Sequence, residues 1–304
     1  PSYVEFITGE GGVIDTWLRR GAAGFRLDVA DELPDEFIEK VRAAVKRVSP
    51  EKFLLGEVWE DATTKFGFNK RRTYLLGKGL DSVMNYPFKN AVLDFVKGKP
   101  AEQAMTEILT ICEHYPAPAM DTALNFLSTH DTERALTVIA DEPANGRGRA
   151  WQSGRCVTGD AYEEGLLRLR MAYAIIYTLP GVPCLYYGDE IAMQGYRDPF
   201  NRAFFRWDAH EQRLRPVLAQ LAQLRHTCEA FRTGQLRVLR AEDGILHYQR
   251  VGKVETAEII VNRTEHIIVE TLASGKSTEV NPMGFTIVVE EVGHNPNHSY
   301  YDYV

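Results

Sequence analysis

Short apolar runs alternate with amphipathic segments along residues 10–232 of this chain. The apolar run 25–27 is followed by a segment that Pro34 opens, in which apolar residues recur on one helical face. A second apolar run, 53–59, comes next. A strand, a helix and a strand within about thirty residues form a parallel crossover unit. Because this pattern recurs, we predict an α/β fold with a parallel sheet.

The number of expected strands bears on which parallel fold this is. Five strands are predicted near residues 25, 54, 83, 124 and 184, the last over 183–187. A (β/α)8 TIM barrel needs eight strands and typically about 250 residues. One interpretation is that the chain holds the C-terminal part of such a barrel, about strands 4–8, and that three strands precede Pro1. The alternative is an open, doubly wound sheet of five strands.

From Gly234 onwards, short strands with turns between them replace the helices. The segments LRVLR, ILHYQR, TAEIIVN, HIIVET and GFTIVVE carry this pattern. They predict a small antiparallel β-sandwich of about 70 residues. We therefore expect two domains, a partial barrel over residues 1–232 and a C-terminal sandwich over residues 233–304.

Composition excludes some classes of partner. The 304 residues carry a net charge of −7, which gives no electrostatic reason to bind nucleic acid or an anionic membrane. No run approaches the roughly 20 apolar residues of a membrane span. The four cysteines are scattered, which favours reduced thiols and a cytoplasmic protein. The start at Pro1 leaves a signal peptide undecided.

Three carboxylates, Asp28, Glu57 and Asp131, each come where an expected strand gives way to a loop. In a parallel barrel these strand ends face one mouth. Arg26 lies on the same strand face as Asp28 and keeps that carboxylate ionised, as a nucleophile requires. Two carboxylates about 5–5.5 Å apart cleave a glycosidic bond with retention. The alternative for Arg26 and Asp28 is an ion pair that ties a strand to its loop.

The segments GFRLDVADE, GEVW and FLSTHD resemble three signature segments of the alpha-amylase family, glycoside hydrolase family 13, and occur in the family's order. The resemblance implies that Asp28 is the nucleophile, Glu57 the acid and base, and Asp131 the group that stabilises the transition state. It also implies that Arg26 and His130 contact the substrate.

The segment RDPFNR matches a family pattern in which an Asp and an Arg, here Asp198 and Arg202, contact the sugar on the non-reducing side. GVPCLYYGDE, residues 181–190, resembles the family's last-strand segment. VADELPDEF and HDTER are most similar to the neopullulanase, cyclomaltodextrinase and maltogenic amylase group. For Trp59, stacking on a sugar ring and packing of a loop at the rim are equally compatible with the sequence.

The resemblance implies a retaining hydrolase of alpha-1,4 and, in some members, alpha-1,6 glucosidic bonds in cyclodextrins, pullulan or maltooligosaccharides. Two alternatives stay open: a non-catalytic amylase-like protein for carbohydrate binding or assembly, and an alpha-glucosidase or transglycosylase of the same family. The family's first signature and its stacking tyrosine are absent and are expected before Pro1. We therefore expect the chain to be inactive or barely active alone.

No cofactor or metal is predicted for this chain. Some family members bind calcium, but the expected ligands lie mostly outside it, and His226 and Cys228 do not share a helix face. The resemblance leaves a homodimer open for a longer form of the protein. Glu133 and Arg134 are expected to form an ion pair at a helix start, and Asp189 and Glu190 to hold the loop after the last strand.

Overall fold

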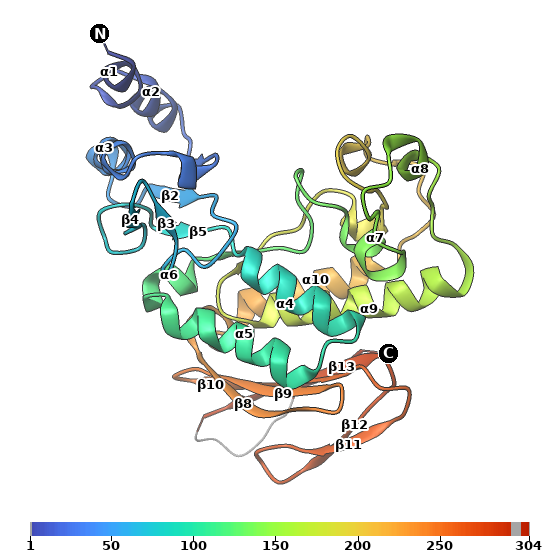
Figure 1. Ribbon diagram of the computed structural model, residues 1–304. Helices are drawn as coiled ribbons and strands as arrows, with labels where there is room; N and C mark the ends of the chain where they lie inside the picture. Colours follow the sequence, from blue (N-terminus) through green and yellow to red (C-terminus); the bar gives the residue numbers. More distant parts are fainter. Residues whose placement is uncertain (1, 293–298, 304) are drawn as a thin grey trace. The chain divides into compact units, whose positions relative to one another are not determined.

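The computed structural model describes residues 2–292 and 299–303 (Figure 1). The chain divides into two compact units. The first contains Pro1–Pro87 and Leu109–Leu124, and the second contains Phe88–Ile108 and Asn125–Val304. The division falls within two helices, α4 (Tyr86–Lys97) and α5 (Ala101–His114), and within strand β6 (Leu124–Asn125).

The first unit is built on a parallel sheet, as the sequence predicted. Its strands are β1 (Gly24–Leu27), β2 (Phe53–Gly56) and β5 (Ser82–Val83), in the order β1-β2-β5. Both strand pairs are parallel, and an isolated parallel bridge joins Met84 to Leu124. Consecutive strands of the crossover pattern are therefore neighbours in the sheet.

Helix α3 (Asp35–Val48) makes the first crossover, between β1 and β2. It begins directly after Pro34, as predicted, because the fixed φ of proline suits a helix start. It buries one apolar face that includes Ile38, Val41 and Val45. The other elements of this unit are α1 (Tyr3–Thr8), α2 (Val13–Arg19), the 3-10 turn η1 (Ala30–Glu32), the hairpin β3 (Phe66–Gly67) and β4 (Lys70–Arg71), and α6 (Ala117–Asp121).

The second unit contains the remaining helices and a large antiparallel sheet. Its helices are α7 (Ala135–Ala140), α8 (Arg149–Ser153), α9 (Gly159–Thr178), α10 (Leu214–Thr227) and α11 (Ala230–Thr233). It also holds strand β7 (Val182–Pro183), which pairs with β6, and the 3-10 turns η2 (Asp189–Ile191) and η3 (Phe200–Arg202). The C-terminal half of α9 is almost wholly buried, in accord with its apolar sequence.

The C-terminal part of the second unit forms two antiparallel sheets (Figure 1). The larger has the order β14-β13-β10-β9-β8, and the smaller pairs β11 with β12. These strands are β8 (Gln235–Glu242), β9 (Ile245–Val251), β10 (Glu255–Asn262), β11 (Ile268–Thr271), β12 (Ser277–Val280), β13 (Gly284–Glu291) and β14 (Ser299–Tyr303). One buried apolar cluster draws on both sheets, with Ile245, Ile260 and Val288 from the larger and Val280 from the smaller.

No helix within residues 2–292 and 299–303 is long and apolar enough to cross a membrane. The four cysteines are free thiols.

Asp81 joins the parallel sheet to the crossover helix. Its carboxylate accepts hydrogen bonds from Arg42 Nη1 at 2.7 Å, Lys46 Nζ at 2.8 Å and the Leu54 amide at 2.8 Å. Burial acts to raise the pKa of Asp81, but the bonds from Lys46, Arg42 and Leu54 outweigh it and hold this pKa below the ordinary 3.8. The ionised form is therefore the one that stabilises the fold.

We expect Asp81→Asn to lower the free energy of unfolding by about 2 kcal/mol at about pH 7, because two cations lose their carboxylate. A carboxyl whose folded pKa is lowered stabilises the protein above its ordinary pKa and loses this effect as pH falls through the folded pKa. The difference between wild type and variant should therefore shrink below about pH 4. Urea denaturation at several pH values measures it, with Asp243→Asn, whose side chain is 82% exposed, as the control. A pH-independent difference would contradict the assignment.

Candidate active site

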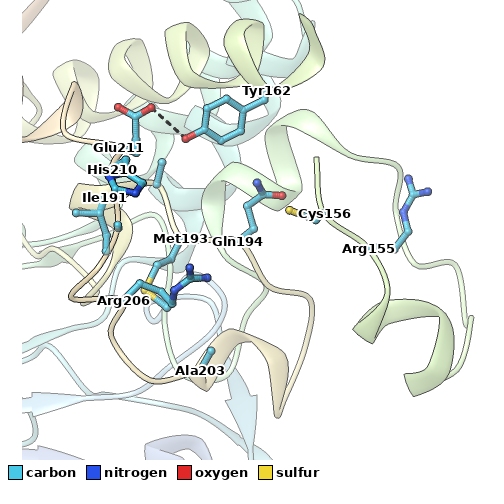
Figure 2. Close-up of a pocket in the computed structure, with 12 residues that line it drawn as sticks. Arg155, Cys156, Tyr162, Ile191, Met193, Gln194, Ala203, Arg206, His210 and Glu211 are labelled. Atoms are coloured by element: carbon cyan, nitrogen blue, oxygen red, sulfur yellow. Dashed lines mark hydrogen bonds between the residues drawn. The ribbon is translucent and has the colours of Figure 1, made fainter. Parts of the chain in front are cut away.

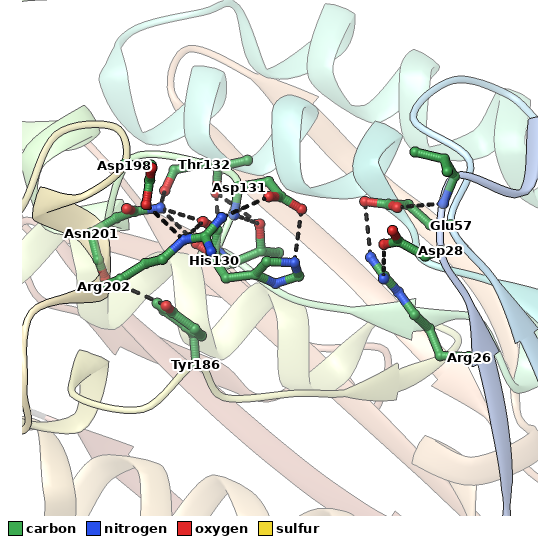
Figure 3. Close-up of polar contacts among 12 residues, drawn as sticks. Arg26, Asp28, Glu57, His130, Asp131, Thr132, Tyr186, Asp198, Asn201 and Arg202 are labelled. Carbon is green, nitrogen blue, oxygen red and sulfur yellow. Dashed lines mark hydrogen bonds and ion pairs between the residues drawn. The ribbon is translucent and has the colours of Figure 1, made fainter. Parts of the chain in front are cut away.

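The ends of β1 and β2 bring two carboxylates to one arginine. Arg26 Nη1 contacts Asp28 Oδ1, and Arg26 Nη2 lies 2.9 Å from Glu57 Oε1 (Figure 3). The register pairs Arg26 with Leu55 and Leu27 with Gly56, so the next residues, Asp28 and Glu57, leave the two strands together. The sequence predicted the contact of Arg26 with Asp28 but missed its contact with Glu57.

The two carboxylates differ sharply in their surroundings. The Asp28 side chain is 73% exposed, whereas that of Glu57 is 2% exposed. Besides its ion pair with Arg26, Glu57 accepts hydrogen bonds from the Val29 amide at 2.9 Å, from Trp59 Nε1 at 3.2 Å and from Tyr86 Oη at 3.4 Å. Buried polar groups are normally paired in this way. One carboxylate is thus open to solvent and the other is enclosed by donors.

Val29 adopts an unusual backbone conformation directly after Asp28. Its φ of 40° and ψ of 53° lie in the left-handed region, which a β-branched residue rarely enters. Such a conformation costs about 1–3 kcal/mol and tends to occur at functional sites. Here it accompanies the hydrogen bond from the Val29 amide to Glu57 Oε2. The turn after β1 therefore links the segment that carries Asp28 to the carboxylate of Glu57.

Trp59 lies beside Glu57 and keeps part of its surface open. Its ring stacks on that of Tyr86, with 4.4 Å between centroids and an angle of 12° between planes. The side chain is 42% exposed while its N–H donates to Glu57. An aromatic ring that is held in place and partly exposed can pack against the apolar C–H edges of a ligand.

A second cluster, in the other unit, surrounds Asp131. His130 Nε2 lies 3.0 Å from Asp131 Oδ2, and Arg202 Nη2 lies 3.2 Å from Asp131 Oδ1. Arg202 Nε also lies 3.0 Å from Asp198 Oδ1 and donates to the backbone carbonyl of His130 at 2.9 Å (Figure 3). Arg202 therefore contacts the other three predicted residues of this part of the sequence. The structure places Arg26, Asp28, Glu57 and Trp59 in the first unit and these four in the second.

The expected ion pair of Glu133 with Arg134 is wrong. Arg134 is fully buried, and its Nη1 lies 3.1 Å from Asp189 Oδ1 and 2.7 Å from the Tyr187 carbonyl. Its guanidinium also lies 4.8 Å from the centroids of both Tyr186 and Tyr187. The strand predicted over 183–187 is shorter than expected, since β7 ends at Pro183, and the two tyrosines beyond it lie against the arginine.

Asp189 has the role that the sequence suggested, and the structure identifies its partners. Tyr173 Oη donates to Asp189 Oδ2 at 2.7 Å, and Arg134 pairs with the other oxygen. Burial raises the pKa of Asp189 to about 6, although Ser128, Tyr173 and Arg134 all act to lower it. The loop after β7 is thereby fixed to the segment that carries Asp131.

Pairs that lie far apart in the sequence were the ones that sequence reasoning missed. Asn201 is buried under the Asp131 turn and donates to the carbonyls of His130 and Thr132 at 2.7 and 2.8 Å. Its only sequence signal was its position inside RDPFNR, next to Arg202.

A further cavity of about 360 Å³ lies in the second unit, lined by residues that include Arg155, Cys156, Tyr162, Arg206 and His210 (Figure 2). Tyr162 donates to Glu211 at its edge. None of the predicted site residues lines it. In the part of the chain that the structure describes, no three His, Cys, Asp or Glu side chains gather as a metal site requires. That the chain needs no metal stays a prediction.

The chain is similar to known carbohydrate-active proteins. Residues 8–232 match the family model for the alpha amylase catalytic domain. A cyclomaltodextrinase from Geobacillus thermopakistaniensis is 33% identical over 255 residues, which are 82% of this chain and 38% of that protein. Neopullulanase 2 from Thermoactinomyces vulgaris is 31% identical over 271 residues, which are 86% of this chain and 41% of that protein. The chain thus spans about two fifths of the length of these relatives.

A solved structure shows the same likeness. The ligand-free cyclic alpha-maltosyl-(1→6)-maltose hydrolase from Arthrobacter globiformis superposes with a TM-score of 0.78 at 25% identity, covering 92% of this chain and 58% of that one.

The shared arginine gives a test of the first cluster. We expect Arg26→Met to lower the free energy of unfolding by about 3 kcal/mol, because it leaves the carboxylate of Glu57 buried and unpaired. Adding Glu57→Gln should recover a large part of this loss, because the charge is then removed as well. Urea denaturation measures both, with Arg19→Met, whose side chain is 72% exposed, as the control. Strictly additive losses in the double variant would contradict the pairing.

Proposed function

The chain belongs to the alpha-amylase family, and we propose that the protein containing it is a retaining glycoside hydrolase of alpha-1,4 glucosidic bonds, with alpha-1,6 bonds as a second linkage. The relatives are named for cyclomaltodextrins, pullulan and a cyclic maltosyl-maltose. We propose the same substrate class here, namely cyclodextrins, pullulan or maltooligosaccharides.

One observation carries this proposal: a single guanidinium contacts both an exposed carboxylate, Asp28, and a buried one, Glu57. A retaining glycosidase needs two close carboxylates with different tasks. The exposed Asp28 can reach the anomeric carbon and form the glycosyl-enzyme intermediate, while Arg26 orients it. Glu57, held by donors near the same point, then serves as acid and base.

The contacts of Glu57 fit the second step of the retaining reaction, the attack of water on the glycosyl-enzyme intermediate, better than the first step. Val29 and Trp59 donate to it and Arg26 forms an ion pair with it, which suits the carboxylate form that takes a proton from water in the second step. In the first step Glu57 must instead carry a proton for the leaving oxygen. We propose that Arg26 then pairs with Asp28 alone, as the negative charge moves from one carboxylate to the other.

The remaining predicted residues would bind the sugar. In this proposal Asp131 stabilises the positive charge that develops on the ring in the transition state. His130, Arg202 and Asp198 offer hydrogen bonds to hydroxyl groups, and the exposed surface of Trp59 packs on a sugar face. The likeness to amylase-family structures supports a longer fold in which β1, β2, β5, β6 and β7 are strands 4–8 of an eight-stranded barrel and residues 233–304 form a separate sandwich. In barrels of this kind the carboxyl ends of the strands face one mouth, where active sites lie.

Asp28→Asn tests the nucleophile in the full-length protein that carries this chain. We expect kcat to fall by at least about 10⁴-fold, because an amide cannot form the glycosyl ester. The melting temperature should change by no more than about 2 °C, since the Asp28 side chain is largely exposed. Initial rates on p-nitrophenyl maltoside and a thermal melt measure the two, and Glu32→Gln in the same exposed segment is the control. A large loss of stability with residual turnover would favour a merely structural ion pair.

We also propose that the 304-residue chain is inactive or barely active by itself. Among the described residues, β1 pairs with β2 on one side and with no strand on its other side. The chain also lacks the family's first signature. Purified chain incubated with p-nitrophenyl maltoside should release less than about 1% of the product formed by the full-length enzyme, because part of the sugar subsite is missing. Turnover near that of the full-length enzyme would refute this.

A further inference from the structure

The turn that carries His130 and Asp131 belongs to no helix or strand, so something else must fix its shape. Within the turn, the Asp131 amide donates to Thr129 Oγ1 at 3.1 Å and the Thr129 amide donates to Thr132 Oγ1 at 3.1 Å. These bonds satisfy two of its N–H groups. The Thr129 carbonyl accepts a long bond from the Thr132 amide at 3.4 Å. The other carbonyl groups of the turn need donors from elsewhere.

Most of those donors come from the side chain of Asn201 in η3, and Arg202 Nε adds one more bond, to the His130 carbonyl. Asn201 Nδ2 lies 2.7 Å from the His130 carbonyl, 2.8 Å from the Thr132 carbonyl and 3.4 Å from the Thr129 carbonyl. An amide nitrogen carries two hydrogens, so the two short contacts use both and the third is weaker. Three carbonyl oxygens around one atom also require that this atom is the nitrogen rather than the oxygen.

Asn201 is 0% exposed, and its Oδ1 has no hydrogen-bond partner among the described residues. Its contribution to the turn therefore comes from the nitrogen alone. The next residue, Arg202, contacts the Asp131 carboxylate and donates to the His130 carbonyl. Two consecutive residues thus hold the turn. The side chain of Asn201 binds only the backbone of the turn, whereas the side chain of Arg202 binds both its backbone and the Asp131 carboxylate.

We propose that Asn201 is a positioning residue, which fixes the backbone of the turn so that the Asp131 carboxylate meets the transition state in the right place. This inference rests on the proposed role of Asp131. A shift of about 1 Å in a catalytic group can cost about 100-fold in rate. An interaction made only in the transition state appears in kcat rather than in KM.

The chain offers a matched residue for comparison. Asn262, in β10, is also 0% exposed, and its Nδ2 donates to the carbonyls of His266, Val280 and Asn281 at 2.8, 3.1 and 3.0 Å. It has the same three-carbonyl environment but contacts none of the residues proposed for chemistry. Its Oδ1 also accepts from the Thr264 amide and hydroxyl at 2.9 and 2.7 Å, so a merely structural loss should be at least as large at Asn262 as at Asn201.

The test compares Asn201→Asp with Asn262→Asp in the full-length protein. Each change puts an acceptor where a donor is needed, so both should lower the melting temperature. Only Asn201→Asp should lower kcat on maltooligosaccharides, by about 100-fold, with KM within about threefold. Its rate relative to wild type should recover as pH falls, and at a pH well above 4, because burial beside carbonyl oxygens raises the pKa of the introduced carboxyl and its protonated form regains one donor. A kcat within about twofold of wild type, or equal kcat losses in both variants, would overturn the proposal.

Two further measurements keep the outcome decisive. If Asn201→Asp does not fold, Asn201→Ser, which keeps one donor, should give an intermediate fall in kcat of about tenfold; an unchanged kcat would contradict the inference. Amide hydrogen exchange over residues 128–135 should be faster in either Asn201 variant and unchanged in Asn262→Asp. Equal exchange in the Asn201 variants and wild type would refute positioning. Because exchange needs no turnover, it distinguishes this failure from the failure of wild type to cleave glucans.

Discussion

The contact of one guanidinium with two carboxylates is the interaction on which the rest of the first unit's site depends. Glu57 is buried at the end of a strand, where an ionised group without a partner would cost several kcal/mol. Arg26 supplies the partner, and it can do so because the parallel register places it beside Leu55, two residues before Glu57. Sheet pairing thus comes first, and the arrangement of charges follows from it.

The second unit solves the same physical problem with different residues. Asp189 is a buried carboxyl that pairs with a buried arginine, Arg134. Here the arginine has no exposed carboxylate to share, and its guanidinium packs against the rings of Tyr186 and Tyr187 instead. Burial still dominates, since the pKa of Asp189 is raised to about 6. This pair therefore fixes a loop, whereas the pair of Arg26 with Asp28 leaves a carboxylate open to solvent.

The spacing of apolar and charged residues predicted those features that depend on residues close together in the sequence. The strands near residues 25, 54 and 83, the helix after Pro34 and the Arg26–Asp28 contact all follow from spacings of a few residues. The contacts that were missed join residues 31 to 71 positions apart, such as Arg26 with Glu57, Arg134 with Asp189 and Asn201 with the His130 carbonyl. No spacing rule selects such partners, because tertiary packing brings them together. The strand predicted over 183–187 was too long for a similar reason. Nothing in the apolar run indicates that Tyr186 and Tyr187 will face Arg134.

The two clusters also differ in what fixes their acids, and this follows from what each acid would have to do. Asp28, the proposed nucleophile, would have to stay open to its substrate, so packing cannot orient it, and a cation beside it does so instead. Asp131 lies on a turn without sheet pairing, so its backbone needs donors from another segment, which Asn201 and Arg202 provide. Residues 198–202 therefore matter to the site beyond any direct contact with sugar. A change in this loop would act on the acid through the backbone that carries it.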